Sequence, residues 1–507
     1  MISAHDTEPH NLLHPWLVRH ADIPEAAFVL EARGSRGVRY GELATSLARC
    51  RELLASWDLR SGDRVGLLIA DPLEFVSWFL AGLHAGLWVA PLDPNTRATR
   101  ATVLGHRARS LQLVALVGDT PLEATVATPW HDATSVPAGD AVLAREEVGG
   151  GVLLASSGTT GAPKVMALSK GQLLANARLI ADHHEFLRSD RGLNSLPLWH
   201  INAEVVGVLA SLYAGSSLVL DDRFHRTGFW KVVNDREVTW INAVPAIISR
   251  LVTLQEGESI PERVRFVRSA SAPLSPTLLR DFERMSGVPV IESYGMTEAA
   301  SQICANPHGA ARKPGSVGRP VGVEVRVRNV HEASGVLAAG EVGPIEIKGP
   351  TVIGAYESPS YADRFDERGW LRTGDLGYFD GDGYLYLVGR SDDVINRGGE
   401  KIYPQEIENV LNSIASLKRV VVIGEPDDVF GQVPVAYLEF APMLARHDQR
   451  LDAALASVRS ILRDGLSRTS RPALLKVVEE IPTHPTGKVR KGMVRNGEVH
   501  VLRVERL

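Results

Sequence analysis

Short apolar runs alternate with amphipathic segments through the first half of the chain. The run at 64–70 (RVGLLIA) precedes a helical pattern at 72–86, and the run at 151–155 (GVLLA) precedes a helical pattern at 170–187. Apolar runs of four to eight residues predict buried strands, and their alternation with helices predicts parallel sheets with helical crossovers. The pattern therefore predicts an α/β fold with doubly wound sheets in its N-terminal part.

The pattern changes to strands and turns from about residue 316. Apolar and aromatic residues around an Asp-Gly-Asp-Gly turn (376–390) predict a β-hairpin. Beyond Arg390, a helical pattern that begins at Pro404 precedes two apolar strand patterns and a longer helical pattern. We therefore predict two domains, 1–390 and 391–507, with a boundary at 390–392 and an α+β composition in the second.

The composition excludes several classes of protein. The chain has 507 residues, a formal net charge of −5 and two cysteines, Cys50 and Cys304. It therefore lacks the basic character of a nucleic-acid-binding protein and cannot form a disulfide framework. No apolar run reaches the roughly 20 residues of a transmembrane helix, and the chain opens without a leader pattern. We expect a cytoplasmic enzyme or binding protein.

The segment SSGTTGAPKV (156–165) combines small residues, hydroxyl groups and one lysine between an apolar run and a helical pattern. Such a loop offers backbone N–H groups and hydroxyls to an anion, near a helix N-terminus that favours negative charge. It is not a Walker A motif, because Pro163 stands where that motif requires glycine. Taken alone, the loop is compatible with phosphate binding and with an ordinary flexible connection.

Four further motifs follow in order along the chain: ESYGMTEAA (292–300), LRTGDLG (371–377), VGRSDDVINRGGEKIYPQEIE (388–408) and PTGKVRK (485–491). With these motifs the chain resembles, from about residue 25 to 495, the superfamily of AMP-forming acyl-CoA synthetases, amino-acid adenylation domains and luciferases. The resemblance implies a large N-terminal domain of doubly wound sheets plus a distorted β-barrel, and a small mobile C-terminal domain. It also implies two reaction steps. A carboxylate attacks the α-phosphate of ATP to give an acyl-adenylate and pyrophosphate, and a thiol then displaces AMP to give a thioester.

The resemblance assigns catalytic and metal-binding roles to residues in the motifs. Lys488 matches the C-terminal catalytic lysine that bridges the acyl carboxylate and the α-phosphate. Such a site needs concentrated positive charge, because a carboxylate and ATP repel each other. Thr297 matches an α-phosphate contact, and Glu298 matches the Mg²⁺-binding glutamate, with Thr160 as a second metal ligand.

Other residues match the ATP- and AMP-binding positions of the superfamily. Tyr294 matches the aromatic residue that lies against adenine, and Asp375 matches the carboxylate that binds the ribose hydroxyls, with Arg390 beside it. The remaining predicted contacts lie in the loop, in a small-residue turn and in the ESYGM motif: Ser156, Ser157, Gly158, Thr159, Thr160, Gly161, Lys164, Ser271, Ala272, Pro273, Glu292, Ser293, Gly295 and Met296. By the same resemblance, the loop grips the β- and γ-phosphates that leave as pyrophosphate.

The C-terminal motifs imply a movement between the two steps. Asp392 matches the hinge position of the superfamily, about which the small domain swings to present a different face for thioester formation. Gly398, Gly399 and Glu400 resemble the stretch that lines the pantetheine tunnel, where glycine permits close backbone approach. A plain turn is the alternative reading of these glycines.

The segment LPLWHINAEVVG (196–207) bears on the identity of the acid. It contains no aspartate to pair with an ammonium group, which argues against an α-amino acid substrate. By resemblance, His200 borders and gates the acyl site; a packing histidine is the alternative. Asn202 would bind a hydroxyl or carbonyl group, and an inward-facing Glu204 would instead admit a remote amine. The predicted pocket lining is mostly apolar and favours a bulky apolar acid of aryl, fatty or terpenoid type: Trp199, His200, Asn202, Val206, Gly207, Met296, Ala300 and Ser301.

The leading function is an acid:CoA ligase that uses ATP, Mg²⁺ and CoA. The first alternative is a stand-alone adenylating enzyme that loads an acyl carrier protein, because both thiols use the same tunnel. A luciferase-like oxygenase and an inactive nucleotide-binding relative are further alternatives. Two positions depart from the superfamily pattern: Val165 replaces the usual glycine after Lys164, and Lys170 replaces a common histidine.

Overall fold

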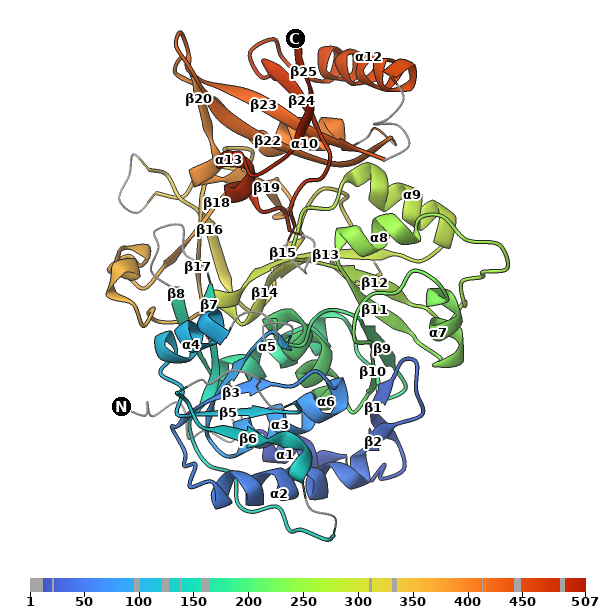
Figure 1. The fold of residues 1–507 in the computed structure, drawn as a ribbon, viewed down its shortest axis with the longest axis vertical. Coiled ribbons are helices and arrows are strands. Elements are labelled where there is room, and N and C mark those ends of the chain that lie inside the picture. The colour runs from blue at the N-terminus through green and yellow to red at the C-terminus, as the bar shows by residue number, and fades with distance from the viewer. Residues whose placement is uncertain are drawn as a thin grey trace.

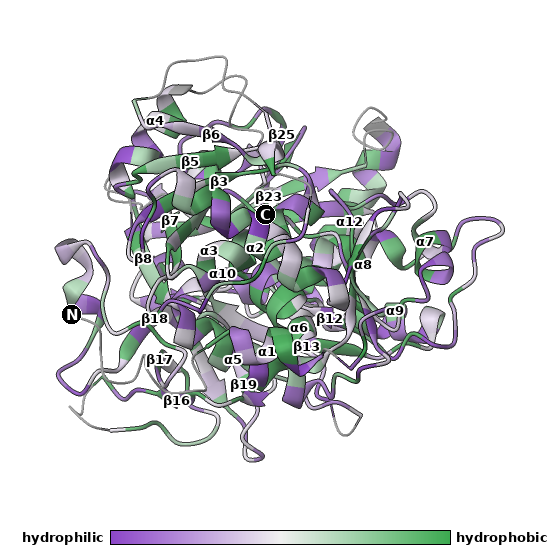
Figure 2. Ribbon diagram, turned by 90° about the horizontal axis from the view of Figure 1, so that it is seen from below, coloured by the Kyte–Doolittle hydropathy of each residue, from purple (hydrophilic) through white to green (hydrophobic). Residues whose placement is uncertain are grey.

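The residues that the structure describes form four β-sheets with helices around them, and the C-terminal residues occupy one end of the long axis of the molecule (Figure 1). No helix in the part of the chain that the structure describes is long and apolar enough to cross a membrane. Hydrophobic residues gather on the inner strands and helices (Figure 2). The structure is a computed structural model, and it describes residues 12–20, 22–94, 101–120, 127–136, 139–156, 164–309, 312–330, 335–412, 414, 416–441, 448–483 and 488–507.

The largest sheet has nine strands and a parallel centre. Six neighbouring strands, from β13 to β1 in the order below, run parallel, and the outer strands pair antiparallel. The strand order is β15 (Arg319–Pro320), β14 (Ser301–Ala305), β13 (Val290–Met296), β12 (Phe266–Ser269), β11 (Trp240–Ala243), β9 (Arg191–Asn194), β10 (Ser217–Leu220), β1 (Ala27–Glu31) and β2 (Gly37–Arg39). Helices in the connections include α6 (Ala210–Ala214), α7 (Phe229–Asp235), α8 (Pro245–Leu251) and α9 (Pro276–Ser286). This arrangement is the doubly wound α/β sheet that the sequence predicts.

A second, six-stranded sheet lies beside the first. Its strand order is β6 (Trp130–Asp132), β5 (Ala115–Gly118), β3 (Arg64–Leu68), β4 (Trp88–Pro91), β7 (Gly151–Ser156) and β8 (Lys164–Ser169). Its neighbouring helices are α1 (His14–Arg19), α2 (Tyr40–Ser56), α3 (Pro72–His84), α4 (Ala101–Ser110) and α5 (Lys170–His183). Asp71 caps α3 by accepting from two backbone N–H groups, and every residue from Leu73 to His84 except Glu74 is buried, as expected for a helix packed on all sides.

The structure corrects the expected position of the phosphate loop. The sequence placed it between a strand and a helix, but residues 157–163 join two antiparallel strands, β7 and β8. Helix α5 begins only at Lys170, so its N-terminus does not adjoin the loop. Val165 is therefore a strand residue, 6% exposed, that packs against hydrophobic side chains of the sheet.

Lys170, the other departure, forms a buried ion pair. Its Nζ lies 2.6 Å from Glu146 Oε1, and both side chains are 3% exposed. Glu146 also accepts from the backbone N–H groups of Leu13 and His14, so the pair ties the start of α1 to α5. Burial lowers the pKa of Lys170, and Glu146 opposes that shift. A structural role therefore accounts for this lysine.

A third, four-stranded antiparallel sheet lies between the two larger sheets and the C-terminal residues (Figure 1). Its strands are β16 (Glu324–Val327), β17 (Gly343–Lys348), β18 (Leu371–Phe379) and β19 (Leu385–Arg390). Strands β18 and β19 form the hairpin that the Asp-Gly-Asp-Gly turn predicts.

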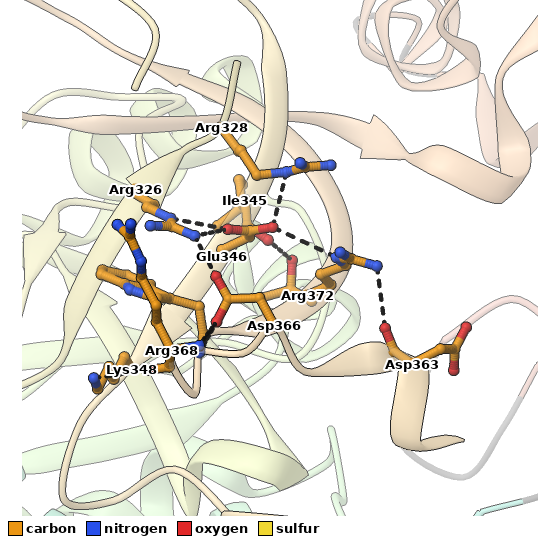
Figure 3. Close-up of polar contacts among 11 residues, drawn as sticks. Arg326, Arg328, Ile345, Glu346, Lys348, Asp363, Asp366, Arg368 and Arg372 are labelled. Atoms are coloured by element: carbon orange, nitrogen blue, oxygen red, sulfur yellow. Dashed lines mark hydrogen bonds and ion pairs between the residues drawn. The ribbon is translucent and has the colours of Figure 1, made fainter. Parts of the chain in front are cut away.

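A buried carboxylate joins the strands of this sheet. Glu346 on β17 contacts Arg326, Arg328 and Arg372, at 2.6, 3.0 and 3.6 Å (Figure 3). Its side chain is 1% exposed, so the three guanidinium groups replace the water that its charge would otherwise need. Arg326 also pairs with Asp366 at 2.9 Å.

The residues beyond Arg390 form a separate six-stranded sheet with its own hydrophobic clusters. The chain leaves the third sheet at the end of β19 and enters the fourth at β20, which brackets the predicted boundary at 390–392. Its strands are β20 (Ile395–Arg397), β21 (Glu400–Ile402), β22 (Leu417–Asp427), β23 (Gly431–Phe440), β24 (Leu474–Val478) and β25 (Val501–Arg506). Its helices are α10 (Pro404–Leu411), α12 (Asp448–Gly465) and α13 (Lys491–Arg495).

The Glu346 cluster predicts a stability effect. Glu346→Gln removes the charge and leaves the arginines around it without their common partner, so we expect the first unfolding transition in urea to lose about 3 kcal/mol. The matched control is Glu324→Gln, an exposed residue on the neighbouring strand β16, which is expected to change stability by less than about 0.5 kcal/mol. Equal effects of the two substitutions would contradict the structural role of Glu346.

Candidate active site

The ends of the phosphate loop lie opposite each other across two strands. Ser156 is the last residue of β7 and pairs in register with Lys164, the first residue of β8. The predicted contacts between them, Ser157, Gly158, Thr159, Thr160 and Gly161, lie outside the described residues. The structure therefore places the two ends of the loop and the side chain of Lys164.

Lys164 reaches a carboxylate from a distant motif. Its Nζ lies 2.5 Å from Oε1 of Glu298, which is in a short 3₁₀ helix, Thr297–Ala299, directly after β13. Tyr356 donates its hydroxyl to the same oxygen at 2.9 Å, and its ring centroid lies 4.5 Å from the ammonium of Lys164. The ring centroid of Tyr361 lies 5.6 Å from the same ammonium. The two tyrosines belong to no motif, so the sequence did not identify them.

The residues around Glu298 fit a magnesium ion. The carboxylate of Glu298 already forms an ion pair with the ammonium of Lys164. The side chain of Glu298 is only 7% exposed, so water screens its charge weakly. A carboxylate that completes its ion's shell with phosphate oxygens and water is the arrangement that Mg²⁺ prefers. The second predicted ligand, Thr160, lies outside the described residues.

Asp375 lies at the meeting point of three motifs. On β18 it pairs in register with Arg390 on β19, whose Nη1 lies 3.0 Å from Oδ1 of Asp375. Tyr294, from β13, donates its hydroxyl to Oδ2 at 2.5 Å. Thr373 accepts from the backbone N–H of Asp375 and donates to the carbonyl of Ile345, next to Glu346. The Glu346 cluster thus supports the strand that holds this carboxylate.

The side chain of Tyr294 is buried. Its side chain belongs to the main hydrophobic cluster at 8% exposure, and burial together with Asp375 raises its pKa well above the usual range. Its hydroxyl is the part directed at the predicted ribose site; the contact of its ring with adenine stays a prediction. Next to it, a Cβ on Gly295 would lie 1.6 Å from the carbonyl oxygen of Ser301, so the bulge between β13 and β14 admits only glycine there.

Other predicted nucleotide contacts also lie at the end of this sheet. Ser293 donates to the carbonyl of Ser269 on the neighbouring strand, and Met296, half-buried, ends β13. Ser271 has φ +72° in the turn after β12 and is exposed, followed by half-buried Ala272 and exposed Pro273. A non-glycine residue with this φ is strained, which is typical of functional turns.

The predicted acyl pocket has two sides. Trp199 and His200 are half-buried and precede a π-helical stretch, Ala203–Leu209, in which Val206 and Gly207 are buried. π-Helical turns often occur at functional sites. On the other side, Ala300 and Ser301 are buried and have positive φ.

A polar network that the sequence reasoning missed joins these two sides. Arg268 on β12 donates to Asn202 and Asn242 through Nη1, at 3.2 and 3.4 Å, and to Gln302 on β14 through Nη2, at 3.3 Å. Asn242 also donates to Asn194 on β9 at 3.0 Å. Single polar residues within apolar strands give no recognisable motif, and only the fold brings them together.

The C-terminal site residues are on the other side of the boundary. Lys488 is exposed, at the end of a loop whose base is fixed by a bridge between Thr483 and Val489. Asp392 is in a short 3₁₀ helix, Ser391–Asp393, directly after β19. Gly398 and Gly399, with φ +59° and +95°, form the tight turn between β20 and β21, and exposed Glu400 begins β21.

Comparison with known proteins identifies the family. The AMP-binding enzyme family matches residues 19–357, and the AMP-binding enzyme C-terminal domain matches residues 406–488. The sulfoacetate–CoA ligase of Cupriavidus necator is 34% identical over 494 residues, covering 94% of this chain and 95% of that protein. The indoleacetate–CoA ligase of Aromatoleum aromaticum is 30% identical over 506 residues, covering 95% and 97%.

Solved structures agree with this result. The o-succinylbenzoate CoA synthetase MenE from Bacillus subtilis, in complex with its acyl-adenylate intermediate, has a TM-score of 0.82 at 28% identity and covers 95% of this chain and 97% of its own. The same synthetase has been solved with ATP and a magnesium ion. The chain therefore belongs to the AMP-binding enzyme family and is an AMP-forming acyl-CoA synthetase. This confirms the predicted fold class and the predicted cofactors, ATP, Mg²⁺ and CoA.

Glu292, a predicted nucleotide contact, gives a pH prediction. Burial raises its pKa from 4.5 to about 8, so the folded state holds a proton between these pH values that the unfolded state has released. The stability of the wild type must therefore fall as the pH rises through this window. Glu292→Gln lacks this titration, and its Tm relative to the wild type is expected to increase steadily from pH 5 to pH 8.

The control for this measurement is Glu262→Gln at an exposed position, whose Tm difference from the wild type is expected to stay constant over the same range. A constant difference for Glu292→Gln as well would show that Glu292 is ionised in the folded protein.

Proposed function

We propose that this protein joins a carboxylic acid to CoA in two steps at one site, through an acyl-adenylate. The contact between Tyr294 and Asp375, 81 residues apart, carries the proposal, because it brings the ESYGM and TGD motifs together at 2.5 Å. Asp375 has carboxylate oxygens for the vicinal ribose hydroxyls, and Arg390 holds it in place. A nucleotide bound there would direct its phosphates toward the β7–β8 loop.

In the first step, the chain's task is to bring two anions together. We assign Lys164 to the departing phosphates and Glu298, with Thr160, to the magnesium ion, which neutralises phosphate charge when bound. Thr297 would contact the α-phosphate, and Lys488 would bridge that phosphate and the acyl carboxylate. Its ammonium would stabilise the charge that develops as the carboxylate oxygen attacks and pyrophosphate departs.

In the second step, we propose that the C-terminal domain, 391–507, turns about Asp392. This rotation moves Lys488 away from the adenylate and brings the backbone at Gly398 and Gly399 next to the thiol. The thiol sulfur attacks the acyl carbon, and AMP departs with the oxygen of the former carboxylate. The exposure of Lys488 and the position of Asp392 between two sheets support this assignment.

The relatives support CoA as the thiol substrate, but they do not identify the class of the acid. The relatives described above are named for CoA, which favours CoA over a carrier protein and favours a ligase over an oxygenase. Their acids range from sulfoacetate to indoleacetate, so the names do not select between a small charged acid and the bulky apolar acid predicted from the sequence. A cytoplasmic location stays a prediction.

Lys488→Ala is expected to separate the two steps. Because Lys488 acts only where the carboxylate meets the α-phosphate, adenylate formation should fall at least about 100-fold. Thioester formation from supplied acyl-adenylate and CoA should change less than about threefold. Pyrophosphate release measures the first step and acyl-CoA formation measures the second.

Two further variants serve as comparisons. Asp392→Pro restricts the hinge and is expected to give the reverse pattern, with pyrophosphate release retained and thioester formation lost. Arg468→Ala, an exposed cation in the same domain, is expected to leave both steps unchanged. Equal losses in both steps for Lys488→Ala would contradict its assignment.

A further inference from the structure

Arg268 is a buried cation that has no acidic partner in the described part of the chain. Its side chain lies at the C-terminal end of β12, and the residue is 1% exposed. All of its recorded partners are neutral amide oxygens, on Asn202, Asn242 and Gln302. No ion pair of Arg268 is recorded among the residues that the structure describes. A buried charge normally has a counter-ion, because its desolvation is otherwise uncompensated.

Neither His183 and His184, which interact with Arg268, nor the buried carboxyl group of Glu204 supplies this counter-ion. Burial lowers the pKa of His183 and of His184, and Arg268 lowers both further, so these rings are neutral at pH 7. Glu204, on the same π-helical stretch as the pocket residues, is fully buried, and burial raises its pKa well above the usual range. The pKa of Arg268 itself is lowered by burial to about 9, so the guanidinium stays charged.

The sheet places this charge beneath the predicted acyl pocket. Asn194, Asn242 and Arg268 are in register on three adjacent parallel strands, β9, β11 and β12, near their carboxyl ends. Ligands of open α/β sheets bind at these ends. The guanidinium contacts both sides of the pocket, through Asn202 after His200 and through Gln302 after Ser301.

The same contacts lead toward the predicted nucleotide site. Asn202 is half-buried and donates from Nδ2 to Ser271 Oγ at 3.4 Å, and Ser271 begins the small-residue turn assigned to the nucleotide. Arg268 and Ser271 are only three residues apart. A short acid would therefore reach from the nucleotide to the guanidinium, whereas a long acyl chain would have to pass this polar network.

The guanidinium has donors left for a ligand. It carries five N–H groups, and the three recorded contacts use one each. Nε is buried and has no hydrogen-bond partner within the described residues. Carboxylate and sulfonate groups present oxygens that accept two parallel N–H bonds from one guanidinium, and such pairs are strong when water is excluded.

We propose that Arg268 binds a second anionic group, a carboxylate or a sulfonate, of a small acid whose other carboxylate is adenylated. This inference rests on the proposed function and replaces the bulky apolar acid with a doubly charged one. The ligand supplies the counter-ion that none of the described residues provides, and the positive charge of Arg268 also offsets the repulsion between this acid and ATP.

The test measures AMP formation by the full-length enzyme with ATP, Mg²⁺ and CoA on pairs of acids of similar size. The pairs are malonate with propionate, succinate with butyrate, and sulfoacetate with propionate; hexanoate and benzoate represent the apolar class. The wild type is expected to show at least about a tenfold higher kcat/KM for the doubly anionic member of one pair. The malonate, succinate and sulfoacetate arms distinguish carboxylate from sulfonate.

Arg268→Met is expected to lower kcat/KM for that doubly anionic acid at least about 30-fold and to change it less than about threefold for the monoacid. Arg268→Lys keeps the charge but loses the planar fork, and an intermediate loss is expected. The matched control is Arg284→Met, an exposed arginine on α9, which is expected to change neither value. Retained AMP binding shows that each variant is folded.

The outcomes separate this inference from the proposed function. AMP formation with only hexanoate, benzoate or the other monoacids would overturn the role of Arg268 and leave the ligase in place. Equal losses on both members of a pair in Arg268→Met would show that Arg268 only supports Asn202 and Asn242. Absence of AMP formation with every acid would overturn the proposed function and this inference with it.

Discussion

The repulsion between two anions, a carboxylate and the polyphosphate of ATP, is the constraint on which this site depends. At contact distance, such repulsion costs several kcal/mol in a partly dry environment unless cations are held nearby. The predicted cations lie on different elements: Lys164 begins β8, Arg268 is the last residue but one of β12, and Lys488 lies between β24 and α13. Each of them lies in a different part of the sequence, so only the folded chain can bring the predicted cations to one site.

The fold meets this constraint through the ends of parallel strands. Strands β9, β11 and β12 end together, which brings Asn194, Asn242 and Arg268 side by side and places the turn at Ser271 next to them. The antiparallel sheet supplies Asp375, and its position depends on Thr373 and on the buried Glu346 cluster. The charges of the Glu346 cluster and the charge of Asp375, which is predicted to bind the nucleotide, are therefore adjacent but use different partners.

The sequence predicted those parts of the site that are written as contiguous motifs. Tyr294, Asp375 and Arg390 lie in three motifs, and the structure brings them into contact. Glu298 and Lys164, likewise predicted, contact each other directly. The alternating apolar and helical patterns also predicted the parallel sheets, because fully buried strands have a distinct composition.

The remaining features depend on contacts between distant single residues. Tyr356 reaches Glu298 from 58 positions away, and Arg268 on β12 contacts Gln302 on β14, on the other side of β13; a local pattern indicates neither contact. The sequence analysis did not predict strand β8. Its short apolar run directly precedes a helix, and such a run cannot be told from the connection to that helix by its pattern alone. Lys170 looked like a departure at the nucleotide loop, and only the fold showed its buried partner, Glu146.

The route of one oxygen atom tests the central claim, adenylation of a carboxylate, most directly. An acid labelled with ¹⁸O in its carboxylates is converted by the full-length enzyme with ATP, Mg²⁺ and CoA, and mass spectrometry measures the ¹⁸O content of the products. Attack on the α-phosphate predicts one ¹⁸O atom in the phosphate of each AMP, because the C–O bond breaks when the thiol displaces AMP. AMP without ¹⁸O, or ¹⁸O in inorganic phosphate, would contradict the account.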